Sequence, residues 1–275
     1  MNRTIDLINK YDPDLIYFDD TALPLWPASD VGLKIAAHYY NKSVKKKGKV
    51  DVVINGKILD EQQRKTMVWD IERGQTSAIE PLPWQTCTCI GDWHYNRTIF
   101  ENHAYRKAKA VIQALVDVVS KNGNLLLSVP VRADGTIDED ERAVVEEIGA
   151  WMAVNKESIV GTRPWKIFGE GPSSEKITPL NAQGFNEGKT QFTSDDIRFV
   201  QKGSSLFVTF FGWPDTNKLR IKSLSLGNEL YPNEIHAVRM LGGTELTFER
   251  ATDGLYVNLS KTKPALAYAN VLQIT

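Results

Sequence analysis

The sequence predicts an α/β domain built on a parallel sheet, followed by an all-β domain of antiparallel strands. Across roughly the first 160 of the 275 residues, short apolar runs alternate with helical segments, which is typical of α/β proteins. These runs are nearly continuous in apolar character, as in strands buried on both faces of a parallel sheet. Beyond them, short β-like runs follow one another between turn signals, without a helical period. We therefore expect one domain over residues 1–160 and a second over 161–275.

The first domain is expected to contain about five strands and the helices between them. The predicted strands are the apolar runs at 14–19, 50–54, 67–71, 84–90 and 124–131. The predicted helices lie at 2–10, from 30 to the basic run at 42–49, at 105–121 and at 138–155. Each helix has apolar residues at helical spacing or acidic residues in its first turn, where the helix dipole favours them.

Local signals indicate where some of these elements begin and end. Ser29 can cap the helix that starts near residue 30. The basic run at 42–49 reads as a solvated face and turn that ends this helix. Asn55 and Gly56 are expected to close the second strand as a turn. Gly123 follows the helix at 105–121, where a left-handed cap is expected.

The second domain begins after residue 160 with a stretch rich in Gly, Pro, Ser and Asn, at 161–188. The β-like runs that follow lie at 197–200, 206–211, 219–223, 235–239, 246–248, 255–257 and 272–275. Short strands at such spacing, separated by turn residues, are typical of an antiparallel β-sandwich.

Composition excludes several classes of partner and environment. The 33 basic residues are balanced by 34 acidic residues, which argues against a nucleic-acid binder because such a protein carries a basic excess. No window reaches the ~18 consecutive apolar residues that a membrane helix needs. Residues 1–10 lack the apolar core of a signal peptide. The sequence has neither a glycine-rich phosphate loop nor a nucleophile elbow, so no cofactor is expected.

Cys87, Cys89 and His94 lie close enough in sequence to raise the question of a metal site. A structural zinc site requires four ligands, and these three do not match such a set. Small buried residues on a strand are the preferred interpretation, and no metal is expected.

Several segments, in order, resemble the family 29 glycoside hydrolases, the α-L-fucosidases. The segment YDPDLIYFDD at 11–20 is similar to the strand that carries the nucleophile in this family, although Asp20 stands where the family usually has glycine. The segments WQTC at 84–87 and GNLLLSV at 123–129 resemble two later strands. DGTI at 134–137, NKESI at 155–159 and TSDDIRF at 193–199 resemble the last barrel turn, the entry to the sandwich and a strand of the C-terminal domain.

The resemblance implies a (β/α)₈-like barrel followed by a β-sandwich. A complete barrel needs roughly 250 residues, and only about 160 precede the expected boundary. The first recognisable strand is the one that lies mid-barrel in the family. The chain is therefore read as the C-terminal portion of a fucosidase, an incomplete barrel of about five strands, either truncated, split or completed by a partner. The cellular compartment is left open, because the chain is read as a portion whose true N-terminus lies upstream. Full-length relatives are often exported.

The resemblance also implies a retaining mechanism with two carboxylates at the carboxyl ends of barrel strands. Asp19 ends the first strand and is expected to be the nucleophile. Glu72 ends the third strand and fits the acid/base, with Glu80 as its rival. Asp70 shares the strand face of Glu72, and its charge would favour the protonated acid. An ion pair between Glu72 and Arg73 is the competing, purely structural interpretation.

Three further residues are candidates for contacts with the substrate. Tyr17 stands where the family often has tryptophan, and its ring could pack on a sugar face or in the core. Lys57 stands where relatives carry arginine, and it could bind sugar or nucleophile or be solvated. Trp93 could line the site or be structural.

The resemblance thus implies hydrolysis of terminal α-L-fucosides on an oligosaccharide or glycoconjugate. Two alternatives remain open: a carbohydrate-binding or structural remnant without hydrolysis, and another glycosidase specificity on the same fold. The missing strands imply a further partner, either the N-terminal half of the barrel or a second copy of the chain, because an open sheet exposes edge groups and apolar surface.

Overall fold

The computed structural model describes the chain except residues 22–27, 176–183 and 189, and it gives only the backbone of Asp20 and Thr21. The expectation for the Asp20 side chain therefore lies outside the described part. The first sheet has five strands, all parallel and in chain order, which confirms the predicted parallel sheet. The strands are β1 (Leu15–Thr21), β2 (Val53–Lys57), β3 (Val68–Glu72), β4 (Trp84–Cys89) and β5 (Gly123–Ser128).

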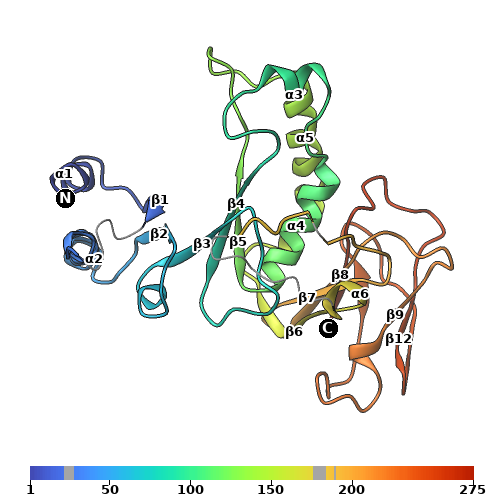
Figure 1. The fold of residues 1–275 in the computed structure, drawn as a ribbon. Helices are drawn as coiled ribbons and strands as arrows, with labels where there is room; N and C mark the ends of the chain where they lie inside the picture. Colours follow the sequence, from blue (N-terminus) through green and yellow to red (C-terminus); the bar gives the residue numbers. More distant parts are fainter. Residues whose placement is uncertain (22–27, 176–183, 189) are drawn as a thin grey trace.

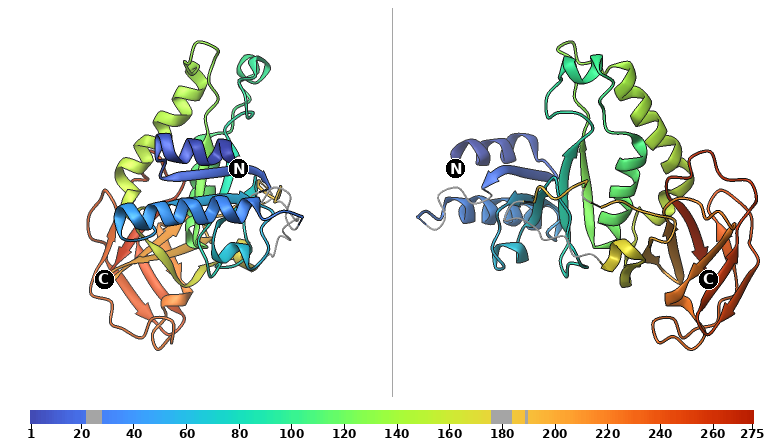
Figure 2. Two further views of the ribbon diagram at one scale, coloured as in Figure 1. Left: turned by 90° about the vertical axis from the view of Figure 1, so that its left-hand side faces the viewer. Right: turned by 45° about the vertical axis from the view of Figure 1, so that its right-hand side comes forward.

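Helices lie beside both edges of this sheet, and α3 (Arg97–Glu101) lies at the tip of the molecule away from it (Figure 1). The other helices of this domain are α1 (Asn2–Tyr11), α2 (Val31–Lys47), α4 (Ala108–Ser120) and α5 (Glu139–Asn155), with short 3₁₀ helices η1 (Gln63–Lys65) and η2 (Lys156–Ser158). Helices α1 and α2 lie beside β1 and β2, far from the C-terminal strands, whereas α4 and α5 lie between the sheet and those strands (Figures 1 and 2). No helix in the described ranges is both long and apolar enough to cross a bilayer.

The parallel sheet does not close on itself in the described residues. Its strand order places β1 at one edge and β5 at the other, so the sheet forms half of a barrel. Apolar side chains on these edge strands are partly in solvent, with Leu15 49% and Leu126 46% exposed. The incomplete barrel predicted from the sequence is confirmed.

The C-terminal region forms two antiparallel sheets that pack as a sandwich, which confirms the second prediction of fold class. One sheet has the order β10-β13-β8-β7-β6 and the other β11-β12-β9. The elements are β6 (Arg163–Glu170), α6 (Pro172–Glu175), β7 (Ile197–Lys202), β8 (Ser205–Phe210), β9 (Lys218–Ile221), η3 (Lys222–Leu224), β10 (Val238–Met240), β11 (Phe248–Ala251), β12 (Gly254–Asn258) and β13 (Asn270–Ile274).

A buried ionic triad joins α4 to the sandwich. Asp117 accepts hydrogen bonds from Lys121 Nζ at 2.8 Å and from Arg198 Nε at 2.6 Å. All three side chains are at most 6% exposed. Burial alone would raise the pKa of Asp117, but the two cations outweigh it and lower that pKa. Helix α4 and strand β7 are therefore held together by charge as well as by a shared apolar core.

Polar side chains lie at the starts of α2 and α5. The Val31 amide donates to Ser29 Oγ at 3.3 Å, but the N-cap of α2 is Asp30, one residue later than the predicted cap. Asp138 precedes α5 and forms a capping box with Glu141, in which each side chain accepts from the other residue's backbone amide.

Helix α2 ends inside the basic run, as predicted, but only at Lys47, so most of the run is helical. Lys42 and Lys46 both pair with Asp12 at the end of α1, so part of the run binds a neighbouring helix. Cations also suit the negative end of the helix dipole. The helix ends at Gly48, whose φ of 75° is the left-handed value that glycine accommodates.

The cap predicted at Gly123 is wrong by one residue. Asn122 has the positive φ, 72°, and Gly123 is already the first residue of β5. A Cβ atom on Gly123 would lie 2.6 Å from the Trp84 ring, so the glycine permits close packing of β5 on β4.

Two strands differ from the expected boundaries. The predicted turn at Asn55 and Gly56 is wrong, because β2 runs through both residues to Lys57. Asn55 is buried, and its Nδ2 donates to Gln85 Oε1 on β4 at 2.7 Å, which gives the side-chain NH₂ group a partner inside the sheet. Strand β6 was not expected in the Gly- and Pro-rich stretch, but it pairs with β7 and buries Trp165 in the sandwich core.

Candidate active site

Three charged side chains meet at the carboxyl ends of β1, β2 and β3. Lys57 Nζ donates to Asp19 Oδ1 at 2.9 Å and to Glu72 Oε2 at 2.7 Å. The two carboxylate oxygens therefore lie within about 6 Å of each other, a separation compatible with the roughly 5–5.5 Å of retaining glycosidases. Parallel strands bring this about, because their carboxyl ends lie at one edge of the sheet.

Lys57 determines the charge of this group. Its side chain is 10% exposed, against 84% for Asp19 and 19% for Glu72. Burial alone would lower the pKa of Lys57, but the hydrogen bonds to Glu72 and Asp19 outweigh it and raise that pKa, so the amine is a cation. The hydrogen bond from Lys57 lowers the pKa of Asp19 below its usual 3.8. Asp19 is therefore ionised at neutral pH, as a nucleophile must be.

A buried polar cluster lies beneath these groups. Asp70 Oδ1 accepts from Tyr17 OH at 3.2 Å and from Cys87 Sγ at 3.1 Å, and Asp70 Oδ2 accepts from Gln85 Nε2 at 2.5 Å. Burial raises the pKa of the Asp70 carboxyl, and burial together with the charge of Asp70 raises the pKa of Cys87 to about 12. Cys87 is thus a neutral thiol that donates to Asp70, and Tyr17 is held by its hydroxyl.

A single open cavity of about 850 Å³ contains the candidate residues. Tyr17, Asp19, Lys57, Glu72 and Trp93, the five residues chosen from the sequence, all line it. Sequence reasoning did not assign to the site four other lining residues: Cys87, His94, Leu126 and Ser128. Alignment of the predicted strands could have identified one of them, because Cys87 on β4 pairs with Glu72 on β3.

Glu80, the alternative acid/base, lies away from the cavity, and Glu72 does not pair with Arg73. The Glu80 amide donates to the Lys121 carbonyl, and the Glu80 carbonyl accepts from Asn122, which immediately precedes β5. Glu80 therefore lies at the amino end of the sheet, opposite the cavity. The ion pair proposed between Glu72 and Arg73 is absent from the described contacts, since Arg73 pairs with Glu187 at 2.5 Å.

Metal ligands do not gather at this site. Cys87 and Cys89 are both buried free thiols. Within the part of the chain that the structure describes, no three His, Cys, Asp or Glu side chains are arranged to hold a metal ion.

Comparisons with known proteins agree with this architecture. A family model described as alpha-L-fucosidase matches residues 1–157, and a model of the alpha-L-fucosidase C-terminal domain matches residues 190–275. The chain is 29% identical over 173 residues to the alpha-L-fucosidase of Dictyostelium discoideum, covering 61% of this chain and 36% of that protein. It is 24% identical over 230 residues to human tissue alpha-L-fucosidase, covering 81% of this chain and 43% of that protein.

Solved structures show the same fold. A Thermotoga maritima alpha-fucosidase matches with a TM-score of 0.69 and 24% identity, covering 100% of this chain and 55% of that one. An alpha-L-fucosidase from Bacteroides thetaiotaomicron matches with a TM-score of 0.69 and 19% identity, covering 100% and 59%. The chain thus spans about half the length, or less, of the relatives it matches.

A parallel half-barrel with acidic side chains at its carboxyl edge, followed by an antiparallel sandwich, defines the class of barrel-type glycoside hydrolases. Within that class the family models cover more than half of the residues. The chain belongs to the α-L-fucosidase family and corresponds to its C-terminal portion.

Proposed function

We propose that this chain contributes both catalytic carboxylates to a retaining α-L-fucosidase. The observation that carries the proposal is the convergence of Asp19 and Glu72 on one Lys57 ammonium at the carboxyl edge of the sheet. Two carboxylates at this separation suit a double displacement, in which no water has to fit between nucleophile and sugar.

Each side chain then has a distinct role. Asp19 attacks the anomeric carbon and forms a glycosyl ester, while Glu72 gives a proton to the leaving oxygen and later takes one from water. Lys57 keeps Asp19 ionised, and the sugar has to displace one of the two Lys57 contacts because the ammonium lies between the carboxylates. Tyr17 and Trp93 offer aromatic rings to the apolar face of the sugar.

The relatives support a fucoside as substrate. The Thermotoga maritima enzyme has been solved in complex with fucose. The Bacteroides thetaiotaomicron enzyme was trapped as a covalent intermediate with 2-fluoro-fucosyl fluoride. We propose the same substrate class here, with a fucosylated oligosaccharide or glycoconjugate as the natural partner.

A panel of 4-nitrophenyl glycosides tests the proposed substrate class. We expect the α-L-fucoside to be hydrolysed faster than the β-D-galactoside, α-D-mannoside and α-L-rhamnoside, with release of 4-nitrophenolate followed by absorbance. Faster hydrolysis of another glycoside would identify that glycoside, instead of the α-L-fucoside, as the substrate class. Hydrolysis of none of them would favour a carbohydrate-binding or structural remnant, a function that the open half-barrel and the 84% exposed Asp19 side chain also support.

The open edges of the sheet lead to a prediction about assembly. Both β1 and β5 lack a second strand partner among the described residues, and apolar side chains such as Leu15 are half-exposed there. Unpaired strands and apolar surface favour association. We expect the 275-residue chain, expressed by itself, to elute as an oligomer or aggregate in size exclusion with light scattering. A monodisperse monomer that melts cooperatively would contradict this expectation.

A further inference from the structure

The segment at residues 184–187, which lies between the sandwich strands β6 and β7, runs along the end of β3. The Phe185 amide donates to the Glu72 carbonyl at 2.8 Å, and the Glu187 amide donates to the Arg73 carbonyl at 2.9 Å. Gly184 forms an isolated parallel bridge with Glu72. The backbone of Glu72 is therefore held by residues more than a hundred positions away in sequence.

The backbone of Gly184 lies so close to the backbone of Glu72 that only glycine fits at position 184. Gly184 has a φ of +110°, and a Cβ atom there would lie 2.1 Å from the Glu72 carbonyl oxygen. On the other side, Asn186 Oδ1 accepts from the Gln75 amide at 2.8 Å, and Asn186 Nδ2 donates to the Gln75 carbonyl at 3.0 Å. The segment is thus fixed on both sides of the Glu72–Arg73 peptide.

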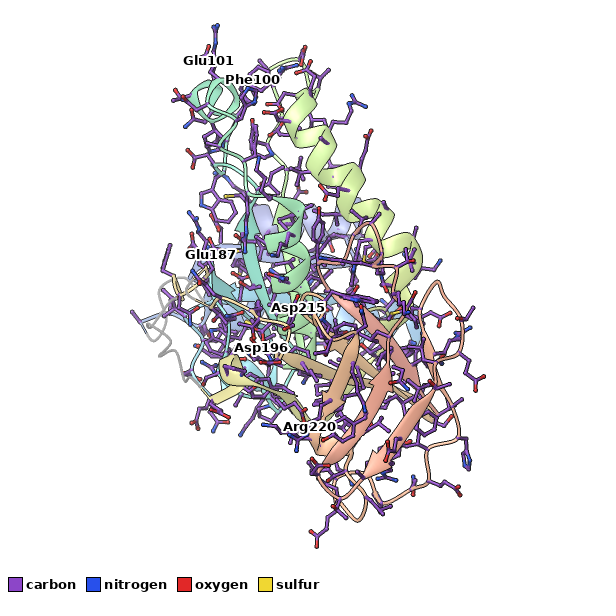
Figure 3. All side chains as sticks on the ribbon, turned by 90° about the vertical axis from the view of Figure 1, so that its right-hand side faces the viewer. Phe100, Glu101, Glu187, Asp196, Asp215 and Arg220 are labelled. Carbon is purple, nitrogen blue, oxygen red and sulfur yellow. The ribbon has the colours of Figure 1, made fainter. Side chains whose placement is uncertain are left out.

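Glu187 carries the charge in this contact. Its carboxylate accepts from Arg73 Nε at 2.5 Å, from Thr88 Oγ1 at 2.6 Å and from Arg106 Nη1 at 3.1 Å. The side chain is 20% exposed and does not line the candidate cavity. Figure 3 shows Glu187 on the half-barrel side of the molecule, whereas Arg220 lies in the sandwich.

Arg73 transmits this contact to its neighbour Glu72. Its φ of 45° is left-handed, an unfavourable conformation for arginine that requires support from its surroundings. Glu187 supplies that support. It also binds the guanidinium group of Arg73, the residue directly after Glu72, so this cation does not pair with Glu72. Glu72 is then left to pair with Lys57 across the cavity.

We infer that Glu187 is a positioning residue that aims Glu72 at the leaving-group oxygen, supplied by the connection between the sandwich strands β6 and β7. The inference rests on the proposed role of Glu72 as acid/base. Glu187 itself touches neither Asp19 nor the cavity, so it acts through Arg73 and the β3 backbone.

The test compares the full chain with its Glu187→Gln variant on aryl α-L-fucosides. The phenolate leaving group departs slowly unless it receives a proton, whereas 2,4-dinitrophenolate departs without one. Only the phenyl fucoside therefore reports on Glu72 as an acid. We expect kcat/KM, which reports formation of the glycosyl ester, to fall about 10-fold or more for phenyl and less than about 2-fold for 2,4-dinitrophenyl, because general acids contribute about 10²–10⁴-fold. Glu170→Gln is the matched control. Its carboxylate also accepts several hydrogen bonds, from Lys222 and Ser223 in the sandwich, and its loss should change neither rate.

An equal loss of kcat/KM on both substrates would overturn the inference, because it would indicate general destabilisation. A second measurement does not need activity. Hydrogen exchange of the Phe185 and Arg73 amides should accelerate about 10-fold or more in Glu187→Gln and stay unchanged in Glu170→Gln, since local opening governs exchange. Should the unsubstituted chain hydrolyse nothing, the proposed function fails and exchange alone decides, with unaltered protection counting against Glu187.

Discussion

Replacing Asp19 with asparagine is expected to lower kcat on 4-nitrophenyl α-L-fucoside by at least about 10⁴-fold, as loss of an essential nucleophile does. The amide has nearly the shape of the carboxylate but cannot attack the anomeric carbon. Loss of the ion pair with Lys57 should cost little stability, because the Asp19 side chain is largely in solvent. The rate should therefore fall while the unfolding transition stays in place.

Asp14→Asn is the matched control for this substitution. Asp14 immediately precedes β1, at the opposite end of the strand from Asp19, and its side chain is 90% exposed. The control should retain the full rate. A covalent probe gives an independent measurement. Asp19 should attack the anomeric carbon of 2-fluoro-fucosyl fluoride and release the anomeric fluoride as an anion, which leaves a 2-fluorofucosyl ester on the peptide that contains residues 11–20. An ester on another peptide, or an active Asp19→Asn variant, would refute the assignment.

The second large effect is expected at the buried triad. Replacing Arg198 with methionine should lower the free energy of unfolding by about 3–5 kcal/mol, because it removes one partner of a buried carboxylate. Asp117 would keep only Lys121 as a cation in a site at most 6% exposed. Urea unfolding followed by tryptophan fluorescence at fixed protein concentration measures the change.

Arg97→Met provides the comparison for this experiment. Arg97 pairs with Glu101 one turn away on α3 with both side chains mostly exposed, so its loss should cost less than about 0.5 kcal/mol. A double substitution of Arg198 and Asp117 by methionine and leucine should recover part of the stability, because no charge is then left buried unpaired. Equal losses for Arg198→Met and Arg97→Met would show that the triad does not hold α4 to β7.

Acid should act on the same triad. The pKa of Asp117 is lowered from 3.8 by Lys121 and Arg198 against the opposing effect of burial. Its contribution to stability is therefore complete above the unfolded value and is lost only as the pH falls through the lower folded value.

The resemblance to the α-L-fucosidases predicted the roles of Asp19 and Glu72, and the strand ends explain why the two residues meet. Both end apolar runs of a parallel sheet, and such strands place their carboxyl ends at one edge. The helix and strand types of the half-barrel followed from periodicity, which reports how one segment buries its own side chains. Where a local signal misled, at Asn55-Gly56, a partner distant in sequence binds the polar side chain.

Sequence by itself determined the parallel sheet and the sandwich, because each depends on the pattern of one segment and its order in the chain. The resemblance to the α-L-fucosidases added the incomplete barrel and five of the residues that line the cavity. Tertiary structure alone decided which charges pair. Lys57 bridges Asp19 and Glu72, and Glu187 rather than Glu72 binds Arg73. Ion pairing depends on distance in space, and a chain that folds back over more than a hundred residues leaves no local trace of that distance.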